Sequence, residues 1–290
     1  MTFLLGIDGG GTSCRAALAT ADGTIIARAR SGSANIHTDL AGARENIVEA
    51  ARLVFAEAGV DASRIPETPI VLGLAGANVG TNAAQLAAML PFNTSLVETD
   101  AMIALEGAVG SGDGAIAILG TGTAYLGRRD GEARPIGGWG FLVSDQGSGA
   151  QIGRELLERT LLAFDEVGPA SPLTREILTV FEKDPSNIVA FAATAKPGDF
   201  AGFAPKVFDH AAQGDIVAEA ILAHGQAVIE ASLLRFDLRP DEPLALLGGL
   251  APLYETRLSA PLRALVRPSL QDALGGAVSM AARLFGAQRP

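Results

Sequence analysis

The feature that most constrains this chain is a short motif that occurs twice. Residues 4–12 read LLGIDGGGT, and residues 116–123 read IAILGTGT. Each pattern predicts a buried strand, a tight turn of glycine and threonine, and a second strand that runs toward an Asp-Gly pair, a strong hairpin signal. The repetition predicts a duplicated structural unit whose two glycine-rich turns face one another.

Both turns have the composition of an anion-binding site. Consecutive glycines permit positive φ angles and let backbone N–H groups approach a ligand closely, while threonine hydroxyls add donors. Asp8, just before the first turn, adds a carboxylate that could hold a hydrated Mg²⁺ beside bound phosphates. The alternative is that both are ordinary hairpin turns without a ligand. The candidate phosphate-binding residues are Gly9, Gly10, Gly11 and Thr12 in the first turn and Gly120, Thr121, Gly122 and Thr123 in the second.

The turns do not match the phosphate-binding motifs that rely on a lysine or on a following helix. A Walker A motif needs a lysine after its last glycine, and protein kinases need a lysine on a strand. The first lysine of this chain is Lys183, far from either turn. A dinucleotide-binding motif requires a helix after its glycines, whereas the segment after Thr12 reads as a strand. Backbone N–H groups, hydroxyls and Mg²⁺ must therefore hold the phosphates.

The composition excludes several classes of protein. The 290 residues suit one large or two smaller domains, and the single cysteine, Cys14, excludes a disulfide framework or a cysteine-based metal site within one chain. A net charge of −10 without a basic cluster argues against nucleic acid and anionic membranes as partners. Neither a signal peptide nor a spanning segment is evident, so we expect a cytoplasmic protein. We also expect a homodimer.

Alternating strands and helices predict an α/β architecture with mixed sheets. The glycine-rich run 110–114 is the predicted boundary between an N-terminal domain, 1–113, and a C-terminal domain, 114–272, with a helical insertion. The last helix, 273–285, is expected to pack back on the first domain. Beyond the two hairpins, the expected strands are 69–74, 95–98 and 244–247, and the expected helices are 41–58, 81–90, 101–108, 151–164, 173–181, 188–195 and 216–235.

Two acidic residues are candidates for chemistry. Asp100 follows a predicted strand and precedes a helix, so it is either the helix N-cap or a general base that accepts a proton from a hydroxyl. Asp145 lies in a glycine-rich loop, 137–149, that also holds the only tryptophan, Trp139. Such a loop suits a sugar, held by a carboxylate against an aromatic wall. Core packing of Trp139 and helix capping by Asp145 explain the same pattern.

Smaller signals lie in loops that follow strands. Asn35 could donate to a ligand or serve as an ordinary turn residue. Gly248 and Gly249 end a predicted strand and would let a flat base lie against the backbone. The three histidines have neither metal-ligand spacing nor a neighbouring nucleophile motif, so we assign them no function.

Together these segments resemble the sugar-kinase, Hsp70 and actin superfamily, and within it the branch of N-acetylglucosamine kinases and BadF/BadG/BcrA/BcrD-type ATPases. Residues 6–12 and 120–123 match its two phosphate motifs, Gly248-Gly249-Leu250 its adenosine motif, and Gly275-Gly276-Ala277 a connecting motif of the interdomain hinge. The resemblance implies duplicated ribonuclease H-like (actin-like ATPase) domains, each with a mixed five-stranded sheet, on either side of an interdomain cleft.

The same resemblance implies roles for individual residues. Asp100 takes the place of the catalytic base, and ATP with Mg²⁺ is the expected co-substrate, with the nucleotide bound by the two turns and by Gly248-Gly249. Ser13-Cys14-Arg15 and the segment 144–150 look closer to the bacterial glucosamine-specific kinases of this branch, which carry a different residue in place of the tryptophan. The positions at or beside the sugar are Asn35, Ala75, Gly76, Trp139 and Asp145.

The leading hypothesis is therefore an ATP-dependent kinase that phosphorylates the 6-hydroxyl of glucosamine, and N-acetylglucosamine is the alternative substrate. Two rival functions fit less well. An ATPase activator of a reductase would need cysteines for a shared iron–sulfur cluster, and a sugar-responsive repressor would need a DNA-reading helix pair before the first strand. The sequence has one cysteine, and only Met1 and Thr2 precede that strand.

Overall fold

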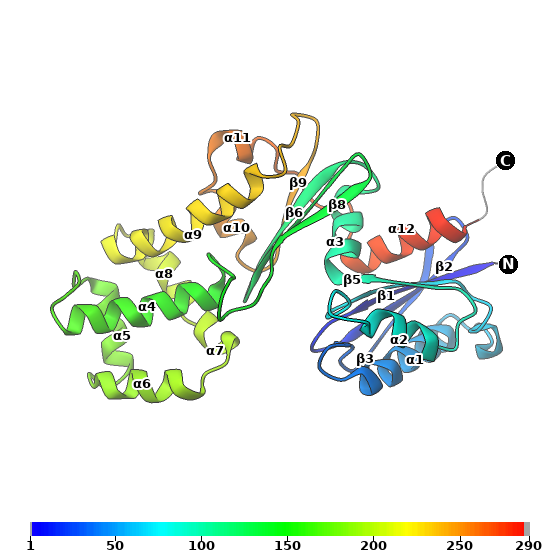
Figure 1. The fold of residues 1–290 in the computed structure, drawn as a ribbon, viewed down its shortest axis with the longest axis horizontal. Helices are drawn as coiled ribbons and strands as arrows, with labels where there is room; N and C mark the ends of the chain where they lie inside the picture. Colours follow the sequence, from blue (N-terminus) through cyan, green and yellow to red (C-terminus); the bar gives the residue numbers. More distant parts are fainter. Residues whose placement is uncertain (1, 287–290) are drawn as a thin grey trace. The chain divides into compact units, whose positions relative to one another are not determined.

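The computed structural model describes residues 2–286, which form two compact units (Figure 1). Unit 1 combines the chain up to Gly112 with the segment from Pro268 onward, and unit 2 spans Asp113–Arg267. The chain therefore leaves unit 1 once and returns to it for its last helix.

A five-stranded mixed sheet forms the centre of unit 1, as predicted for this half of the chain. Its strand order is β3-β2-β1-β4-β5, with antiparallel pairing from β3 to β1 and parallel pairing from β1 to β5. The elements of unit 1 are β1 (Phe3–Gly9), β2 (Cys14–Thr20), β3 (Ile25–Ser31), α1 (Leu40–Glu57), η1 (Ala62–Arg64), β4 (Ile70–Leu74), α2 (Asn82–Met89), β5 (Ser95–Thr99), α3 (Asp100–Val109) and α12 (Ala273–Phe285).

Apolar helices cover both faces of this sheet. Successive strand residues point to opposite faces, so the neighbours Leu4 and Leu5 enter different cores. Leu5 shares a buried cluster with Ile47 and Phe55 of α1. Leu4 shares another with Ala277 of α12 and residues of α3. Because β1, β3 and β4 run in the same direction, their carboxyl ends lie at one edge of the sheet.

The close approach of α12 and α3 depends on glycine. A Cβ on Gly276 would lie 2.0 Å from the carbonyl oxygen of Ile103 and 2.5 Å from the amide nitrogen of Gly107, so no larger residue fits. Figure 1 shows α12, drawn in red, beside α3 although the two helices are far apart in sequence. The motif 275–277 is thus a helix-packing contact within unit 1, and its role as a hinge stays a prediction.

Unit 2 contains a four-stranded sheet, so the prediction of five strands was wrong for this half. Its order, β8-β7-β6-β9, repeats the pairing pattern of the first four strands of unit 1. Duplication itself stays a prediction. Beyond β9 there is only an isolated bridge between Leu244 and Val266. Unit 2 ends at Arg267, the residue after this bridge, so the pairing does not extend into a fifth strand.

Helices make up most of the remainder of unit 2. Among the described residues, α9 is the one helix long and apolar enough to cross a membrane. Its Val217, Ile221 and Ile229 are instead buried in the core of unit 2, together with Leu119 of β6. The elements of unit 2 are β6 (Gly114–Leu119), β7 (Thr123–Arg129), β8 (Glu132–Gly137), α4 (Gly149–Phe164), α5 (Pro172–Val180), α6 (Pro185–Thr194), α7 (Pro197–Ala201), α8 (Ala204–Ala211), α9 (Ile216–Leu234), β9 (Leu244–Leu247), α10 (Ala251–Glu255) and α11 (Ala260–Arg263).

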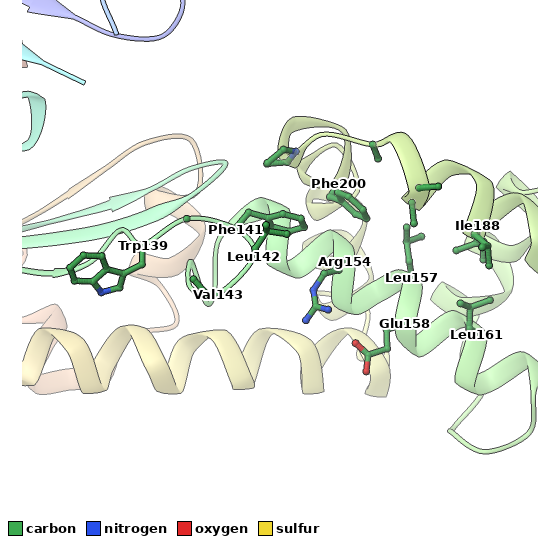
Figure 2. A pocket seen from close by; sticks show the side chains of 16 residues that line it. Trp139, Phe141, Leu142, Val143, Arg154, Leu157, Glu158, Leu161, Ile188 and Phe200 are labelled. Atoms are coloured by element: carbon green, nitrogen blue, oxygen red, sulfur yellow. The ribbon is translucent and has the colours of Figure 1, made fainter. Parts of the chain in front are cut away.

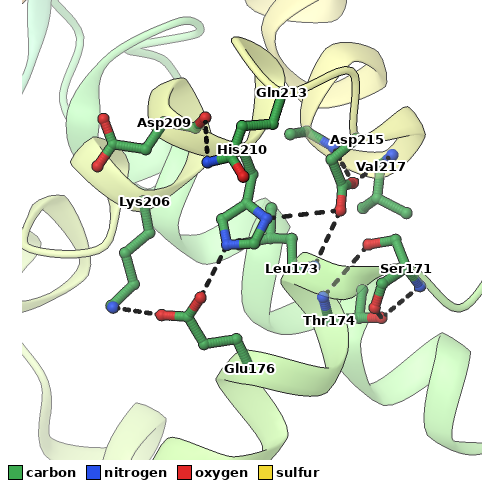
Figure 3. Close-up of polar contacts among 11 residues, drawn as sticks. Ser171, Leu173, Thr174, Glu176, Lys206, Asp209, His210, Gln213, Asp215 and Val217 are labelled. Carbon is green, nitrogen blue, oxygen red and sulfur yellow. Dashed lines mark hydrogen bonds and ion pairs between the residues drawn. The ribbon is translucent and has the colours of Figure 1, made fainter.

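A cluster of ion pairs joins α5, α8 and α9 (Figure 3). Glu176 of α5 accepts from Lys206 at 2.5 Å, and its second oxygen lies 2.8 Å from Nε2 of His210. These two partners hold the pKa of the Glu176 carboxyl below its usual range. Asp215 caps α9 and also accepts from the backbone N–H of Leu173 at 2.9 Å. His210, to which the sequence analysis assigned no function, thus has a structural one.

Candidate active site

The first glycine turn lies where three loops of unit 1 meet. Gly10 donates its N–H to the carbonyl of Ser13 at 2.9 Å, which closes the turn between β1 and β2. The carbonyl of Gly10 accepts from Ala34 at 2.9 Å, and that of Gly9 accepts from Ala75 at 2.8 Å. The loops after β1, β3 and β4 are therefore bonded together at the carboxyl ends of these strands, where ligands bind in α/β folds.

Asp8 pairs with an arginine that the sequence analysis overlooked. The register of the hairpin places Arg15 opposite Asp8, and Nε of its guanidinium donates to Oδ2 of Asp8 at 3.0 Å. Another nitrogen of the same guanidinium donates to Asp272 at 3.1 Å. Counting outward from the turn pairs residue 9 with 14 and residue 8 with 15. The sequence alone could therefore have revealed this cross-strand ion pair.

The single carboxylate of Asp8 suits a metal ion that binds together with a nucleotide. Within residues 2–286, no group of three His, Cys, Asp or Glu side chains could hold a metal ion. Mg²⁺ commonly uses one or two protein carboxylates together with substrate phosphates and water. The carboxylate of Asp8 has lone pairs beyond those that Arg15 uses, so it could be the protein carboxylate that binds such a Mg²⁺. Its assignment as a metal ligand stays a prediction.

Asn35, Ala75 and Gly76 come together beside the first turn. Oδ1 of Asn35 accepts from the N–H of His37 at 3.0 Å, so the residue does have the ordinary turn role that we considered. Gly76 has a φ of +84°, and a Cβ there would lie 3.1 Å from the same oxygen. The side-chain amide nitrogen of Asn35 has no hydrogen-bond partner in the described part of the chain. It therefore remains able to donate to a ligand.

Asp100 is not the N-cap of α3. Thr99 has that role, because its hydroxyl accepts from the N–H of Met102 at 3.1 Å. Asp100 is the first helical residue, and its exposed side chain accepts from the adjacent N–H of Ala101 at 2.8 Å. Partial desolvation by nearby protein atoms raises the pKa of Asp100 above its ordinary 3.8, and the negative charge of Asp8 acts in the same direction. This carboxylate can accept a proton.

The second glycine turn is bonded to the start of α4. Gly120 donates its N–H to the carbonyl of Gly122 at 3.0 Å, which closes the turn between β6 and β7. The carbonyl of Gly120 accepts from Gly149 at 2.8 Å, and that of Thr121 accepts from Ala150 at 3.2 Å. The first N–H groups of this helix are therefore used to fix the turn and are not directed at a ligand.

The glycines of the two turns do not use positive φ angles, so that part of the prediction was wrong. Gly9, Gly10, Gly11, Gly120 and Gly122 all have ordinary φ values. Two of them are needed for packing. A Cβ on Gly9 would lie 2.5 Å from the side chain of Leu74, and a Cβ on Gly122 would lie 2.8 Å from Oδ2 of Asp145.

Four other glycines have no packing reason to be glycine. An ideal Cβ on Gly11 or Gly249 would meet no heavy atom within 4 Å, and on Gly10 and Gly120 the nearest atoms would be 3.9 and 4.0 Å away. None of the four has a positive φ, so alanine would fit each site without strain. The backbone N–H groups of Gly11 and Thr12 also lack hydrogen-bond partners among residues 2–286. Glycine at these positions would let a ligand approach the backbone closely, and their assignment to the nucleotide stays a prediction.

Gly248 differs from its neighbour Gly249. Its φ is +93°, and a Cβ there would lie 2.4 Å from the carbonyl oxygen of Leu119. The same carbonyl accepts from the N–H of Leu250 at 2.9 Å. The fold therefore requires Gly248, and these contacts hold the predicted adenosine motif against the strand that leads into the second turn.

Asp145 is not a helix cap, because Ser148 caps α4. Asp145 is only 8% exposed and has a left-handed φ of +66°. Burial raises the pKa of its carboxyl, while hydrogen bonding from the backbone of Thr123 and Gly140 opposes this rise. With Gly122 packed against it, the carboxylate adjoins the second glycine turn, a neighbour that the sequence analysis did not identify.

Trp139 is not a core residue, since 77% of its surface is exposed. Positive φ angles at residues 137, 138 and 140 carry its loop away from the core. Figure 2 shows Trp139 at one end of an open, mainly apolar groove of about 1210 Å³ that continues over Phe141, Phe200 and Leu157. The exposed indole is free to stack on a ligand, and its contact with a sugar stays a prediction.

Comparisons with known proteins identify the family. The model of the BadF/BadG/BcrA/BcrD ATPase family matches residues 5–258. Glucosamine kinase GspK from Vibrio cholerae is 35% identical over 98% of this chain and 97% of its own length. N-acetyl-D-glucosamine kinase from Dictyostelium discoideum is 32% identical over 76% of this chain and 74% of its own. The crystal structure of a presumed N-acetylglucosamine kinase from Chromobacterium violaceum covers 96% of this chain and 98% of its own, with a TM-score of 0.83 and 32% identity. This chain therefore belongs to the BadF/BadG/BcrA/BcrD ATPase family.

Proposed function

We propose that this chain is an amino-sugar kinase that transfers the γ-phosphoryl group of ATP to the 6-hydroxyl of glucosamine. The Vibrio cholerae relative, similar over nearly its whole length, is named a glucosamine kinase. The Dictyostelium discoideum relative is named for N-acetylglucosamine, which is therefore the alternative substrate. The observation that carries the proposal is the set of open glycines, Gly10, Gly11, Gly120 and Gly249, in the three segments assigned to the nucleotide.

The chemistry that we propose uses Asp100 as the general base. It would accept the proton of the sugar hydroxyl as that oxygen attacks the γ-phosphorus, and its raised pKa makes it a stronger base than an ordinary aspartate. Positioning and charge neutralisation supply most of the remaining catalysis in phosphoryl transfer. The unpaired N–H groups of Gly11 and Thr12 would bind phosphate oxygens. Mg²⁺, bound with ATP near Asp8, would neutralise charge on the phosphates.

The residues that we propose for sugar recognition are Asn35, Ala75 and Gly76 in unit 1, and Trp139 and Asp145 in unit 2. The free amide of Asn35 and the carboxylate of Asp145 are complementary to sugar hydroxyls, since one donates and the other accepts. The two candidate substrates differ in one group: glucosamine carries an ammonium where N-acetylglucosamine carries an acetamido group. The exposed Trp139 offers an apolar surface to an acetyl methyl.

A substrate panel tests the proposal. The assay couples ADP release to an optical signal and offers glucosamine, N-acetylglucosamine, glucose and N-acetylmannosamine in turn. We expect the highest kcat/KM with glucosamine and a 6-phosphate product identified by NMR. A preference for N-acetylglucosamine would favour the alternative, and no turnover with either amino sugar would refute the kinase assignment.

Gly11→Ala is expected to weaken ATP binding roughly tenfold, because a methyl group would keep phosphate oxygens from the N–H groups of this turn, and a hydrogen bond to a charged group contributes about 1.5–3 kcal/mol. Stability should not fall, since φ is ordinary and the space is open. Calorimetric titration with a non-hydrolysable ATP analogue measures the affinity, and thermal unfolding measures the stability.

Gly198→Ala is the matched control for this experiment. Gly198, at the start of α7, also has an ordinary φ and no atom within 4 Å of an ideal Cβ, but it lies outside the proposed nucleotide segments. We expect its ATP affinity to match the wild type. Unchanged affinity in folded Gly11→Ala would remove the first turn from the phosphate site.

A cytoplasmic location and a homodimer are also part of this proposal. ATP, the proposed co-substrate, is supplied in the cytoplasm, and the apolar helix α9 has several of its residues in the core of unit 2. The exposed apolar residues Leu142 and Val143, which help to line the groove, offer surface that a second copy could cover. Sedimentation of the purified chain would measure its oligomeric state.

A further inference from the structure

The hydroxyl of Tyr254 joins two segments of unit 2 that the proposed function uses for different substrates. Tyr254 lies in α10, which follows Gly248 and Gly249 of the predicted adenosine motif. Its hydroxyl donates to the carbonyl of Gly147 at 2.8 Å, inside the loop that carries Asp145. Tyr254 is fully buried and Gly147 is buried as well.

On the nucleotide side, Tyr254 is fixed by the backbone. Its N–H donates to the carbonyl of Leu250 at 3.0 Å, and the N–H of Leu250 donates to the carbonyl of Leu119 at 2.9 Å. Leu119 is the last residue of β6, directly before the second glycine turn. The tyrosine ring also packs edge-on against Phe208, with ring centroids 5.6 Å apart.

On the loop side, the neighbours of Gly147 are bonded to the same turn. The hydroxyl of Thr123 donates to the carbonyl of Gln146 at 3.2 Å, and the N–H of Gly149 donates to the carbonyl of Gly120 at 2.8 Å. The Tyr254 contact therefore closes a ring of hydrogen bonds that runs from the adenosine motif through the loop and back to the turn.

Residues of α9 pack closely around the Gly147 peptide. Gly147 has a φ of +78°, and a Cβ there would lie 2.8 Å from the side chain of Ile229. A Cβ on Gly225 would lie 2.7 Å from the Cα of Gly147 and 2.9 Å from the Tyr254 hydroxyl. Helix α9 therefore packs closely against Gly147, and the hydroxyl of Tyr254 donates a hydrogen bond to the buried carbonyl of this glycine.

We propose that Tyr254 is a positioning residue for the amino-sugar site. By holding the Gly147 peptide, its hydroxyl sets the direction of the Asp145 carboxylate, two residues earlier, relative to the second glycine turn. This inference rests on the proposed function, in which Asp145 binds the sugar. Tyr254 is fully buried and so is not placed to touch either substrate, and we expect it to act on the sugar through Asp145.

The test is Tyr254→Phe, which removes the hydroxyl and keeps the ring that contacts Phe208. The buried carbonyl of Gly147 loses its partner, and we expect the sugar KM to rise roughly tenfold as the loop loosens. We expect kcat and the ATP KM to stay within about twofold of the wild type, because binding of the sugar is what is lost.

Tyr125→Phe is the matched control, since Tyr125 is the only other tyrosine of the chain. Its hydroxyl is also buried and lies near Thr123 and Ser232, but it forms no hydrogen bond of ordinary geometry with the described residues and does not contact Gly147. We expect its sugar KM to equal that of the wild type. Thermal unfolding of both variants shows whether either has lost its fold at the assay temperature, and amide hydrogen exchange at residues 146–149 should quicken only in Tyr254→Phe.

The outcomes separate this inference from the proposed function. A wild type that phosphorylates no amino sugar refutes the proposed function and the inference with it. An active wild type whose sugar KM is unaffected by Tyr254→Phe overturns the inference alone, whatever the exchange data show. Equal KM increases in the two tyrosine variants would also overturn it, because the effect would then not depend on the bond to Gly147.

Discussion

Asp100→Asn is expected to lower kcat about 100-fold or more, the usual scale for a positioned general base, without loss of the fold or of ATP binding. The amide cannot accept a proton from the sugar hydroxyl. The fold should persist because Thr99, not Asp100, caps α3. An asparagine oxygen can also still accept from Ala101. Steady-state kinetics with glucosamine and ATP, together with thermal unfolding, measures both effects.

The pH dependence gives this prediction a second readout. In the wild type, kcat should fall on the acid side as Asp100 becomes protonated, with a midpoint above 3.8 because partial desolvation by nearby protein atoms and the charge of Asp8 raise its pKa. The variant should lack this acid limb. Glu98→Gln is the control, because burial raises the pKa of Glu98 as well, two residues earlier on β5. A variant of Asp100 with wild-type turnover would show that the carboxylate has no part in proton transfer.

The sequence was sufficient for features that depend on neighbouring residues. Both hairpins form as predicted, and the second strand of each ends in the expected turn at Asp22-Gly23 or Asp130-Gly131. The predicted strand 244–247 has the same bounds as β9, and the long helices differ from prediction by a few residues at their ends. Apolar periodicity and Asp-Gly turns act locally, so a single sequence contains them.

Features that depend on distant residues could not be predicted in this way. Asp145 and Gly122 are far apart in the chain, yet the carboxylate of one occupies the space of the missing Cβ of the other. The exposure of Trp139 follows from the left-handed φ angles of three glycines around it. From the sequence, these glycines indicate only a tight loop, not the direction in which the loop turns. Short helices such as α7 and α10 have too few residues for a periodic pattern.

The sequence left open whether Asp100 and Asp145 are helix caps, and the structure decides against capping for both. Asp100 and Asp145 both precede helices and both have side chains suited to capping. In each case a hydroxyl residue takes the role, Thr99 for α3 and Ser148 for α4. The N-cap is a single residue position, whereas sequence patterns locate the end of a helix only to within one or two residues. The carboxylates have other partners instead: that of Asp100 accepts from the N–H of Ala101, and that of Asp145 from the backbone of Thr123 and Gly140.

Asp145→Asn is expected to raise the sugar KM about tenfold or more, with a much smaller change in the ATP KM. Hydrogen bonds to a charged group contribute about 1.5–3 kcal/mol, and the amide offers the sugar one accepting oxygen in place of two. Asparagine is the informative substitution because the φ of this residue is +66°, a conformation that asparagine tolerates and alanine does not. The measurement is a full KM determination for both substrates.

A structural role for Asp145 would give a different pattern. Its carboxylate packs against Gly122, so loss of that support would disturb the second glycine turn and raise the ATP KM together with the sugar KM. Ser148→Ala supplies the reference for simple helix destabilisation, because it removes the true cap of α4 and should lower the stability by about 1 kcal/mol. If Asp145→Asn lowers the melting temperature as Ser148→Ala does but keeps the sugar KM, Asp145 supports the loop and does not bind the sugar. A raised sugar KM at an unchanged melting temperature would assign the carboxylate to the substrate.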